Sequence, residues 1–140
     1  MSIRTTVVAL TLGLGGAFAA CAGLARAAQE TSRTTQDGVY TAKQAERGKE
    51  SYKQVCAGCH PLDWYSGDVM KAWDGAPLGD LYEVIATTMP QSNPGSLKRR
   101  EYLDLVAYIL SLNDMPSGSE DLPAPAEDLR KILVKWRHKP

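Results

Sequence analysis

Two thiols and an imidazole stand together in the stretch Cys56-Ala57-Gly58-Cys59-His60. Two cysteines separated by two residues and followed at once by a histidine form the attachment pattern of a c-type haem. One helical turn with a small pair of residues inside it brings both sulfurs to the two vinyl edges of one porphyrin, where they can form thioethers. The imidazole of His60 then projects under the ring toward the iron. The pattern predicts one covalently bound haem c, held by Cys56, Cys59 and His60.

Two other kinds of chemistry are compatible with a cysteine pair of this spacing. A redox-active pair of the thioredoxin kind would need a βαβ context, which the sequence does not show. Half of a zinc site would need further ligands, and the remaining cysteine and histidine, Cys21 and His138, stand near opposite ends of the chain. Haem attachment is therefore the preferred interpretation, with these two as alternatives.

Haem iron has two axial positions, and a methionine is the best candidate for the second. Met89 follows His60 by 29 residues, which allows a loop and a helix to pass the ring edge and return on the opposite face. Pro90 disfavours helical backbone at Met89 and holds the thioether in an extended segment. Met70 follows His60 by only ten residues, and Met115 lies beyond the last long helix. We predict that His60 and Met89 bind the iron, with Met70 or an open sixth position as alternatives.

The elements that must position these ligands are helical. Periodic apolar residues and breakers predict helices over residues 41–55, 78–87 and 96–112, with irregular chain over 61–78 between the first two. Thr41 is the expected N-cap of the first helix. Gly48 lies inside that helix, where a glycine costs roughly 1 kcal/mol against alanine. We expect that this glycine allows another helix to approach closely.

The order of the motifs along the chain is similar to that of the class I cytochromes c, over residues 42–113. The resemblance rests on Gly48-x-x-x-Tyr52-x-x-x-Cys56-x-x-Cys59-His60, on Met89-Pro90 and on Asp104-Leu105-Val106-Ala107-Tyr108-Ile109-Leu110. It implies an all-α domain in which the N- and C-terminal helices cross near Gly48 around one covalently bound haem. It also implies a one-electron carrier rather than an enzyme.

A finer resemblance concerns the partners. Ser92-x-Pro94-Gly95-Ser96-Leu97 after the methionine, and Asn113-x-x-Pro116-x-Gly118 after the last long helix, are similar to cytochromes that accompany pyrroloquinoline-quinone dehydrogenases. This likeness implies electron transfer from a periplasmic quinoprotein dehydrogenase toward an oxidase or another cytochrome of the respiratory chain. The alternatives are an electron-transfer subunit bound permanently to one dehydrogenase, and a haem sensor or peroxidase-like protein with an open sixth site.

The N-terminal segment has the pattern of an export signal. Arg4 precedes an uncharged apolar run, and Ala25-Arg26-Ala27 fits a small-x-small cleavage site, so residues 1–27 are predicted to be a signal peptide and the mature protein to be periplasmic. Cys21 adds two alternatives, lipidation at that cysteine or an uncleaved anchor, and only these would place the protein on a membrane. Residues 28–40 are then expected to be a disordered lead-in and residues 41–118 the cytochrome domain.

The charge of the whole chain excludes one class of partner, and two local features remain to be explained. Lys and Arg number 16, as do Asp and Glu, so no basic field predicts a nucleic-acid partner. Lys98, Arg99 and Arg100 stand near the start of the last long helix. They are either ordinary solvated charge or a positive rim that attracts an acidic partner.

Residues 119–140 form a tail with a predicted amphipathic helix, which is expected to fold back on the domain or to dock on a partner. The apolar side of that helix comprises Leu129, Ile132, Leu133 and Trp136.

Overall fold

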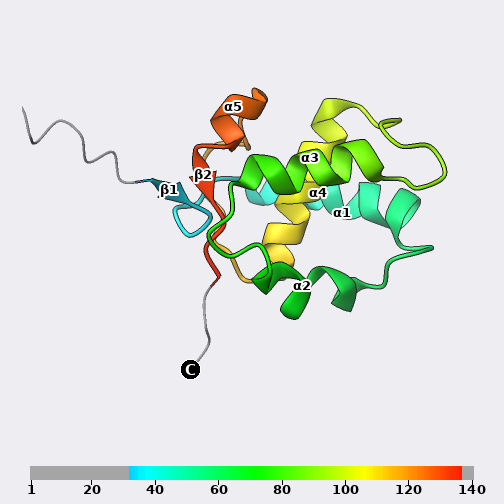
Figure 1. Ribbon diagram of the computed structural model, residues 1–140, viewed down its shortest axis with the longest axis horizontal. Helices are drawn as coiled ribbons and strands as arrows, with labels where there is room; N and C mark the ends of the chain where they lie inside the picture. The colour runs from blue at the N-terminus through cyan, green and yellow to red at the C-terminus, as the bar shows by residue number, and fades with distance from the viewer. Residues whose placement is uncertain (1–31, 137–140) are drawn as a thin grey trace, which may run out of the picture. The chain divides into compact units, whose positions relative to one another are not determined.

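The computed structural model describes residues 32–136, so the predicted signal peptide, Cys21 and His138 lie outside the described residues. Helices dominate this part of the chain, and one pair of very short strands accompanies them (Figure 1). In chain order the elements are β1 (Arg33–Thr34), α1 (Ala42–Ser51), the π-helix η1 (Tyr52–Cys56), the 3₁₀ helix η2 (Leu62–Tyr65), α2 (Asp68–Lys71), α3 (Leu78–Thr88), α4 (Arg99–Leu112), α5 (Ala126–Leu129) and β2 (Ile132–Leu133).

The first helix begins where its cap predicts. The Thr41 hydroxyl accepts a hydrogen bond from the Gln44 backbone N–H at 3.0 Å, which confirms Thr41 as the N-cap. The helix continues without a break from α1 into η1 and ends at Cys56, close to the predicted end at residue 55. The haem-attachment motif is therefore built directly onto the end of this long helical segment.

Helices α1 and α4 cross in contact, as expected for the all-α cytochrome fold. Gly48 lies at the crossing, where a Cβ atom added to it would stand 1.8 Å from the backbone oxygen of Asp104 and 2.9 Å from Cβ of Tyr108. No side chain larger than hydrogen fits between the two backbones there. The expectation that Gly48 allows a close helix approach is confirmed.

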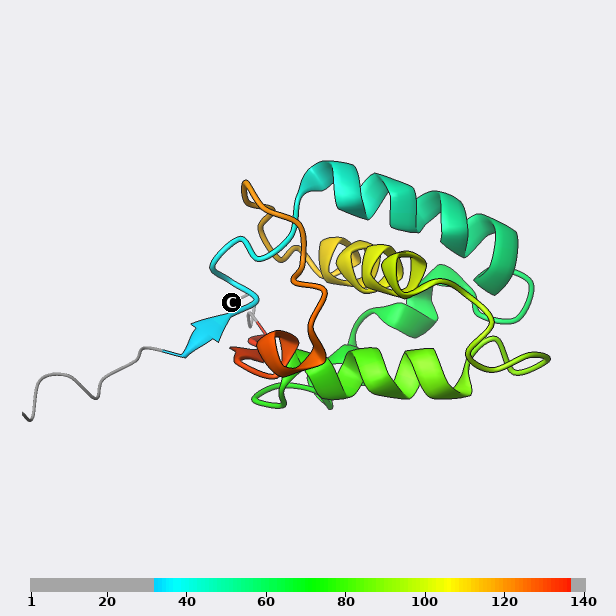
Figure 2. The same ribbon diagram turned by 90° about the horizontal axis from the view of Figure 1, so that it is seen from above.

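Helix α4 is the central element of the domain. Figure 2 shows it between α1 and α3, and it contacts both. Its residues 102–110 are all buried, so α4 is apolar around most of its circumference. It begins at Arg99 with Lys98 as the N-cap residue, slightly later than the helix predicted over residues 96–112. Because η1, which continues α1, ends at Cys56 and α3 is followed by Met89, α4 helps to fix the separation of these two ends.

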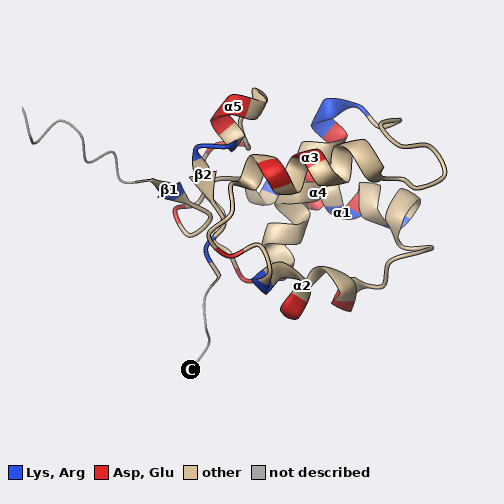
Figure 3. Ribbon diagram, in the orientation of Figure 1, with Lys and Arg blue, Asp and Glu red and all other residues tan. Residues whose placement is uncertain are grey.

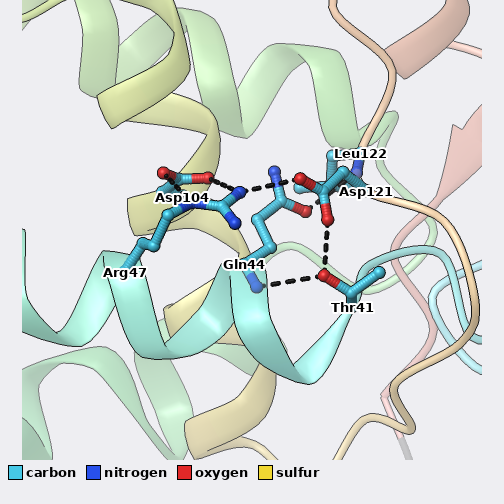
Figure 4. Close-up of polar contacts among 6 residues, drawn as sticks. All are labelled: Thr41, Gln44, Arg47, Asp104, Asp121 and Leu122. Carbon is cyan, nitrogen blue, oxygen red and sulfur yellow. Dashed lines mark hydrogen bonds and ion pairs between the residues drawn. The ribbon is translucent and has the colours of Figure 1, made fainter.

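A polar network connects the tail to this helix crossing (Figure 4). The Arg47 guanidinium donates to both carboxylate oxygens of buried Asp104, each at 2.8 Å, and to Asp121 at 2.7 Å. The buried Gln44 side chain accepts a hydrogen bond at 2.8 Å from the Leu122 backbone N–H. Charged groups from α1, α4 and the tail are thus paired with one another, and the tail is held against the domain.

The tail folds back on the domain, but the predicted amphipathic helix through Leu129, Ile132, Leu133 and Trp136 is wrong. Helix α5 ends at Leu129, and Ile132 and Leu133 form β2, which pairs in parallel with β1. Leu129 belongs to α5 and Ile132 to β2, and both side chains enter the same core. Their spacing of three residues therefore does not reflect a single helix. Residues 119–136 are therefore part of the domain rather than an appendage to it.

The structure also differs from the lead-in expected over residues 28–40. Residues 32–40 pack against the domain through β1 and through Val39 and Tyr40, which are 1% and 2% exposed. The Tyr40 hydroxyl donates to the Met115 carbonyl at 2.6 Å. This segment has few apolar residues, and its order depends on backbone pairing with β2. The amino-acid composition of residues 28–40 cannot indicate such a distant pairing.

Candidate haem site

The cysteine motif forms a tight turn at the end of η1. The backbone N–H groups of Cys59 and His60 both donate to the Cys56 carbonyl, at 3.1 and 2.9 Å. Ala57 keeps right-handed helical backbone angles, so the two thiols are separated by a single helical turn. Cys56 is half-buried and Cys59 is exposed, and both are free thiols. The predicted helical presentation of the two sulfurs is confirmed.

Three tyrosines hold this turn against α4. The Tyr52 hydroxyl donates to the His60 carbonyl at 2.6 Å, which ties the end of the motif back to the start of η1. The Tyr52 ring meets Tyr65 edge-on at 6.0 Å and Tyr108 at 5.6 Å between centroids. Tyr65 also contacts the His60 ring at 5.6 Å. Burial raises the pKa of the Tyr52 and Tyr65 hydroxyls, so the cluster is neutral at physiological pH.

Met89 is placed by the end of α3. It is the C-cap residue with φ −120° and ψ 152°, so the extended backbone predicted from Pro90 is confirmed. Its N–H donates to the Ile85 carbonyl at 3.0 Å, and its own carbonyl accepts from the Tyr102 hydroxyl at 2.7 Å. Buried Tyr102 thus fixes the residue from the side of α4. Tyr102 lies within the apolar pattern of its helix, and no local signal in the sequence distinguishes its hydroxyl.

One cavity of about 570 Å³ brings the motif and Met89 together. Its walls come from η1 and the attachment turn, from the end of α3, from the chain after Met89 and from α4. All four predicted site residues line it, and most of the other lining side chains are apolar or aromatic. The lining residues are Tyr52, Val55, Cys56, Cys59, His60, Tyr65, Ile85, Met89, Pro90, Gln91, Ser92, Leu97, Tyr102, Leu105, Tyr108 and Ile109.

The donor set fits a covalently bound haem better than it fits the two alternatives. A reactive disulfide-forming cysteine needs a lowered thiol pKa, but burial, and after it the neighbouring Cys59, raise the pKa of Cys56. Among residues 32–136, no group of three or more His, Cys, Asp and Glu side chains could hold a metal ion. Two thiols, an imidazole and a thioether around an apolar cavity match the ligands that a haem c uses.

The other two methionines of the described chain lie elsewhere. Met70 and Met115 are 1% and 3% exposed, pack in the core and do not line the cavity. Met70 therefore has the ordinary structural role of a core methionine. Of the described methionines, Met89 is the one at the cavity.

The comparison with protein families agrees with this geometry. Residues 43–109 match the model described as "Cytochrome C oxidase, cbb3-type, subunit III". The matched stretch runs from the start of α1 to near the end of α4, and over these residues the chain is similar to a cytochrome c domain. The comparison with curated proteins gave no match, and the comparison with solved structures gave none either.

A cytochrome c domain carries a covalent haem c, and Cys56, Cys59 and His60 fit its attachment motif. Such domains act in electron transfer and are extracytoplasmic. Within residues 32–136, no helix has the length and hydrophobicity that a membrane span requires. Over residues 43–109 the chain is therefore similar to the electron-carrying domains of this family.

Proposed function

We propose that this protein is a periplasmic one-electron carrier in which His60 and Met89 are the two axial ligands of the haem iron. The observation that carries the proposal is that both residues line the same cavity as Cys56 and Cys59. If His60 and Met89 both held the iron, no coordination site would be left open for a small ligand or a substrate. A sensor or peroxidase-like protein would need such an open site.

The protein's own residues would keep the positions of the two ligand residues the same in the ferric and ferrous states. When bound, the haem supplies a one-electron ferric/ferrous couple, and a thioether ligand raises its potential. Tyr52 and Tyr102 hold the backbone carbonyls of His60 and Met89 through hydrogen bonds of 2.6 and 2.7 Å. The backbones of both ligand residues are therefore held, from η1 and from α4, which would limit their rearrangement on electron transfer.

We propose a quinoprotein-type dehydrogenase as the electron donor and an oxidase or another cytochrome as the acceptor. The donor rests on the likeness of the chain after Met89 and after α4 to cytochromes of such dehydrogenases. The acceptor is supported by the family description, which names a subunit of a terminal oxidase. Contacts with both partners should be small and transient. Leu129 and Ile132 are 0% and 2% exposed in the domain's own core, so they cannot anchor the protein permanently to an enzyme.

The ligand assignment is tested by a pair of matched substitutions. Met89→Leu and Met70→Leu both replace a thioether by a side chain of similar volume, which typically costs less than about 1.5 kcal/mol of stability. In the ferric protein, a sulfur–iron bond gives a weak long-wavelength charge-transfer band. We expect Met89→Leu to abolish this band, to lower the reduction potential and to allow the ferrous protein to bind carbon monoxide.

Met70→Leu is the control, because Met70 lies in the core and away from the cavity. It should keep the band and the potential of the wild type. A Met89→Leu protein with an unchanged band and potential would exclude Met89 as a ligand. The donor is tested separately, by measuring whether a purified quinoprotein dehydrogenase and its alcohol substrate reduce the ferric protein.

A further inference from the structure

The short helix η2, directly after the haem-attachment motif, exposes large apolar side chains. Leu62 is 47% exposed and Trp64 is 53% exposed. Tryptophan is normally among the most extensively buried residues, and an exposed apolar cluster commonly marks an interaction site. Pro61 caps the helix with an extended backbone, and the Trp64 N–H bonds to its carbonyl at 3.0 Å, so this surface has a defined shape.

Trp64 contacts the iron-side histidine from outside the cavity. Its ring centroid lies 5.5 Å from that of His60, with 44° between the ring planes. The cavity is lined by His60 and Tyr65 but not by Trp64, so the exposed part of the indole belongs to the outer surface. One aromatic side chain therefore reaches from the protein surface to the imidazole of His60.

The charges around this surface are mainly acidic. Asp63 lies within η2, and Asp68 and Asp74 follow in the next turns of chain. Lys71 is the one basic residue of residues 61–74, and it is paired with Asp68 at 2.8 Å. Figure 3 shows acidic residues on η2 and α2, and basic residues at the start of α4, on the opposite side of the view. The His60 side and the Met89 side of the domain thus differ in charge.

We propose that Leu62, Asp63 and Trp64 form a docking surface for a redox protein whose contact face is apolar with a basic rim. Trp64 both fills the contact and provides an aromatic connection from that partner to His60. One electron passes from the reduced partner to ferric iron, and Trp64 contributes contact and electronic overlap without changing its own oxidation state. This proposal rests on the proposed carrier function and adds the side of the domain at which one partner binds.

The basic and acidic sides can be tested separately with the haem-loaded protein on two electrodes. One gold surface carries a mixed monolayer of methyl- and ammonium-terminated thiols, which imitates an apolar, basic partner. The other carries a carboxylate-terminated monolayer, which attracts the side of residues 98–100. Voltammetry gives the amount of bound protein and its electron-transfer rate constant on each surface.

We expect Trp64→Ala to bind the ammonium surface about tenfold more weakly, which corresponds to about 1.4 kcal/mol, since aromatic residues are often among the strongest contacts of an interface. Its rate constant there should also fall, whereas both quantities stay at the wild-type level on the carboxylate surface. Trp64→Phe should restore most of the loss, because it keeps an aromatic ring. Val84→Ala is the matched control, since Val84 is 47% exposed on α3 and lies outside the proposed surface.

A second variant, Asp63→Asn, tests the surface without altering any apolar contact. It should weaken binding to the ammonium surface and leave binding to the carboxylate surface unchanged. Equal behaviour of Trp64→Ala and wild type on the ammonium surface, or equal losses on both surfaces, would overturn the docking proposal while the carrier function stands. A wild-type protein without a reversible one-electron signal on either surface would refute the carrier function itself.

Discussion

The close crossing of α1 and α4 makes Gly48→Ala the most direct test of the fold. The added Cβ would lie 1.8 Å from the Asp104 carbonyl oxygen, whereas ordinary contact begins near 3.4 Å. The obstacle is backbone in the middle of a helix and cannot rotate away. The two helices would have to separate locally by about 1.6 Å, the difference between those two distances.

The expected cost follows from two opposing effects. Forced overpacking of a core costs typically 1–3 kcal/mol, and an immovable obstacle places this site near the upper value. Alanine recovers about 1 kcal/mol because it favours helical backbone more than glycine does. We therefore expect the haem-loaded Gly48→Ala protein to be about 2 kcal/mol less stable than wild type.

Guanidinium unfolding followed by far-ultraviolet circular dichroism measures this loss. The midpoint should fall by about 0.5–1 M with an unchanged slope. Lys49→Ala is the control on the next residue, whose side chain is 41% exposed and makes only a surface ion pair with Glu46. It should stay within about 0.5 kcal/mol of wild type. If Gly48→Ala were as stable as Lys49→Ala, the inferred contact between the two backbones would be refuted.

Two further predictions concern single hydrogen bonds. Tyr102→Phe removes the donor to the Met89 carbonyl, so on heating, the ferric sulfur–iron band should disappear at a lower temperature than in wild type; identical melting of the band would contradict this role. The Thr41 hydroxyl, followed by the Arg47 guanidinium, lowers the pKa of Asp121. The ionised carboxylate therefore stabilises the folded protein above its ordinary pKa, and this stabilisation is lost as the pH falls through the lowered pKa. Asp121→Asn should accordingly lower the unfolding midpoint at neutral pH in low salt, with a gap that closes below about pH 4; a gap independent of pH would exclude this ion pair as its cause.

Much of the site could be predicted because its determinants are local or depend only on chain order. The spacing of Cys56, Cys59 and His60 specifies one helical turn whatever surrounds it. The extended backbone of Met89 follows from the proline after it. Gly48 could be interpreted because a glycine inside a helical pattern requires a compensating contact.

The tail and the polar network could not be predicted in the same way. Spacing at three and four residues over Leu129–Trp136 indicates a helix, but the observed strand depends on pairing with Arg33–Thr34, which lie about a hundred residues earlier. The partners of Arg47 are likewise 57 and 74 residues distant in sequence. Nothing in the local sequence indicates which carboxylates a guanidinium will meet at such separations.

The pairing of β1 with β2 sets an order for the events of folding. A chain shorter than 132 residues has no partner for β1, and it also lacks Ile132 and Val134, which the finished core encloses. Closing so long a loop is entropically costly, so we expect the pairing of β1 with β2 to form late in folding. As the chain grows from its N-terminus, the thiols of Cys56 and Cys59 are synthesised well before the domain can close. Haem attachment can therefore take place on an incompletely folded chain, before β1 pairs with β2.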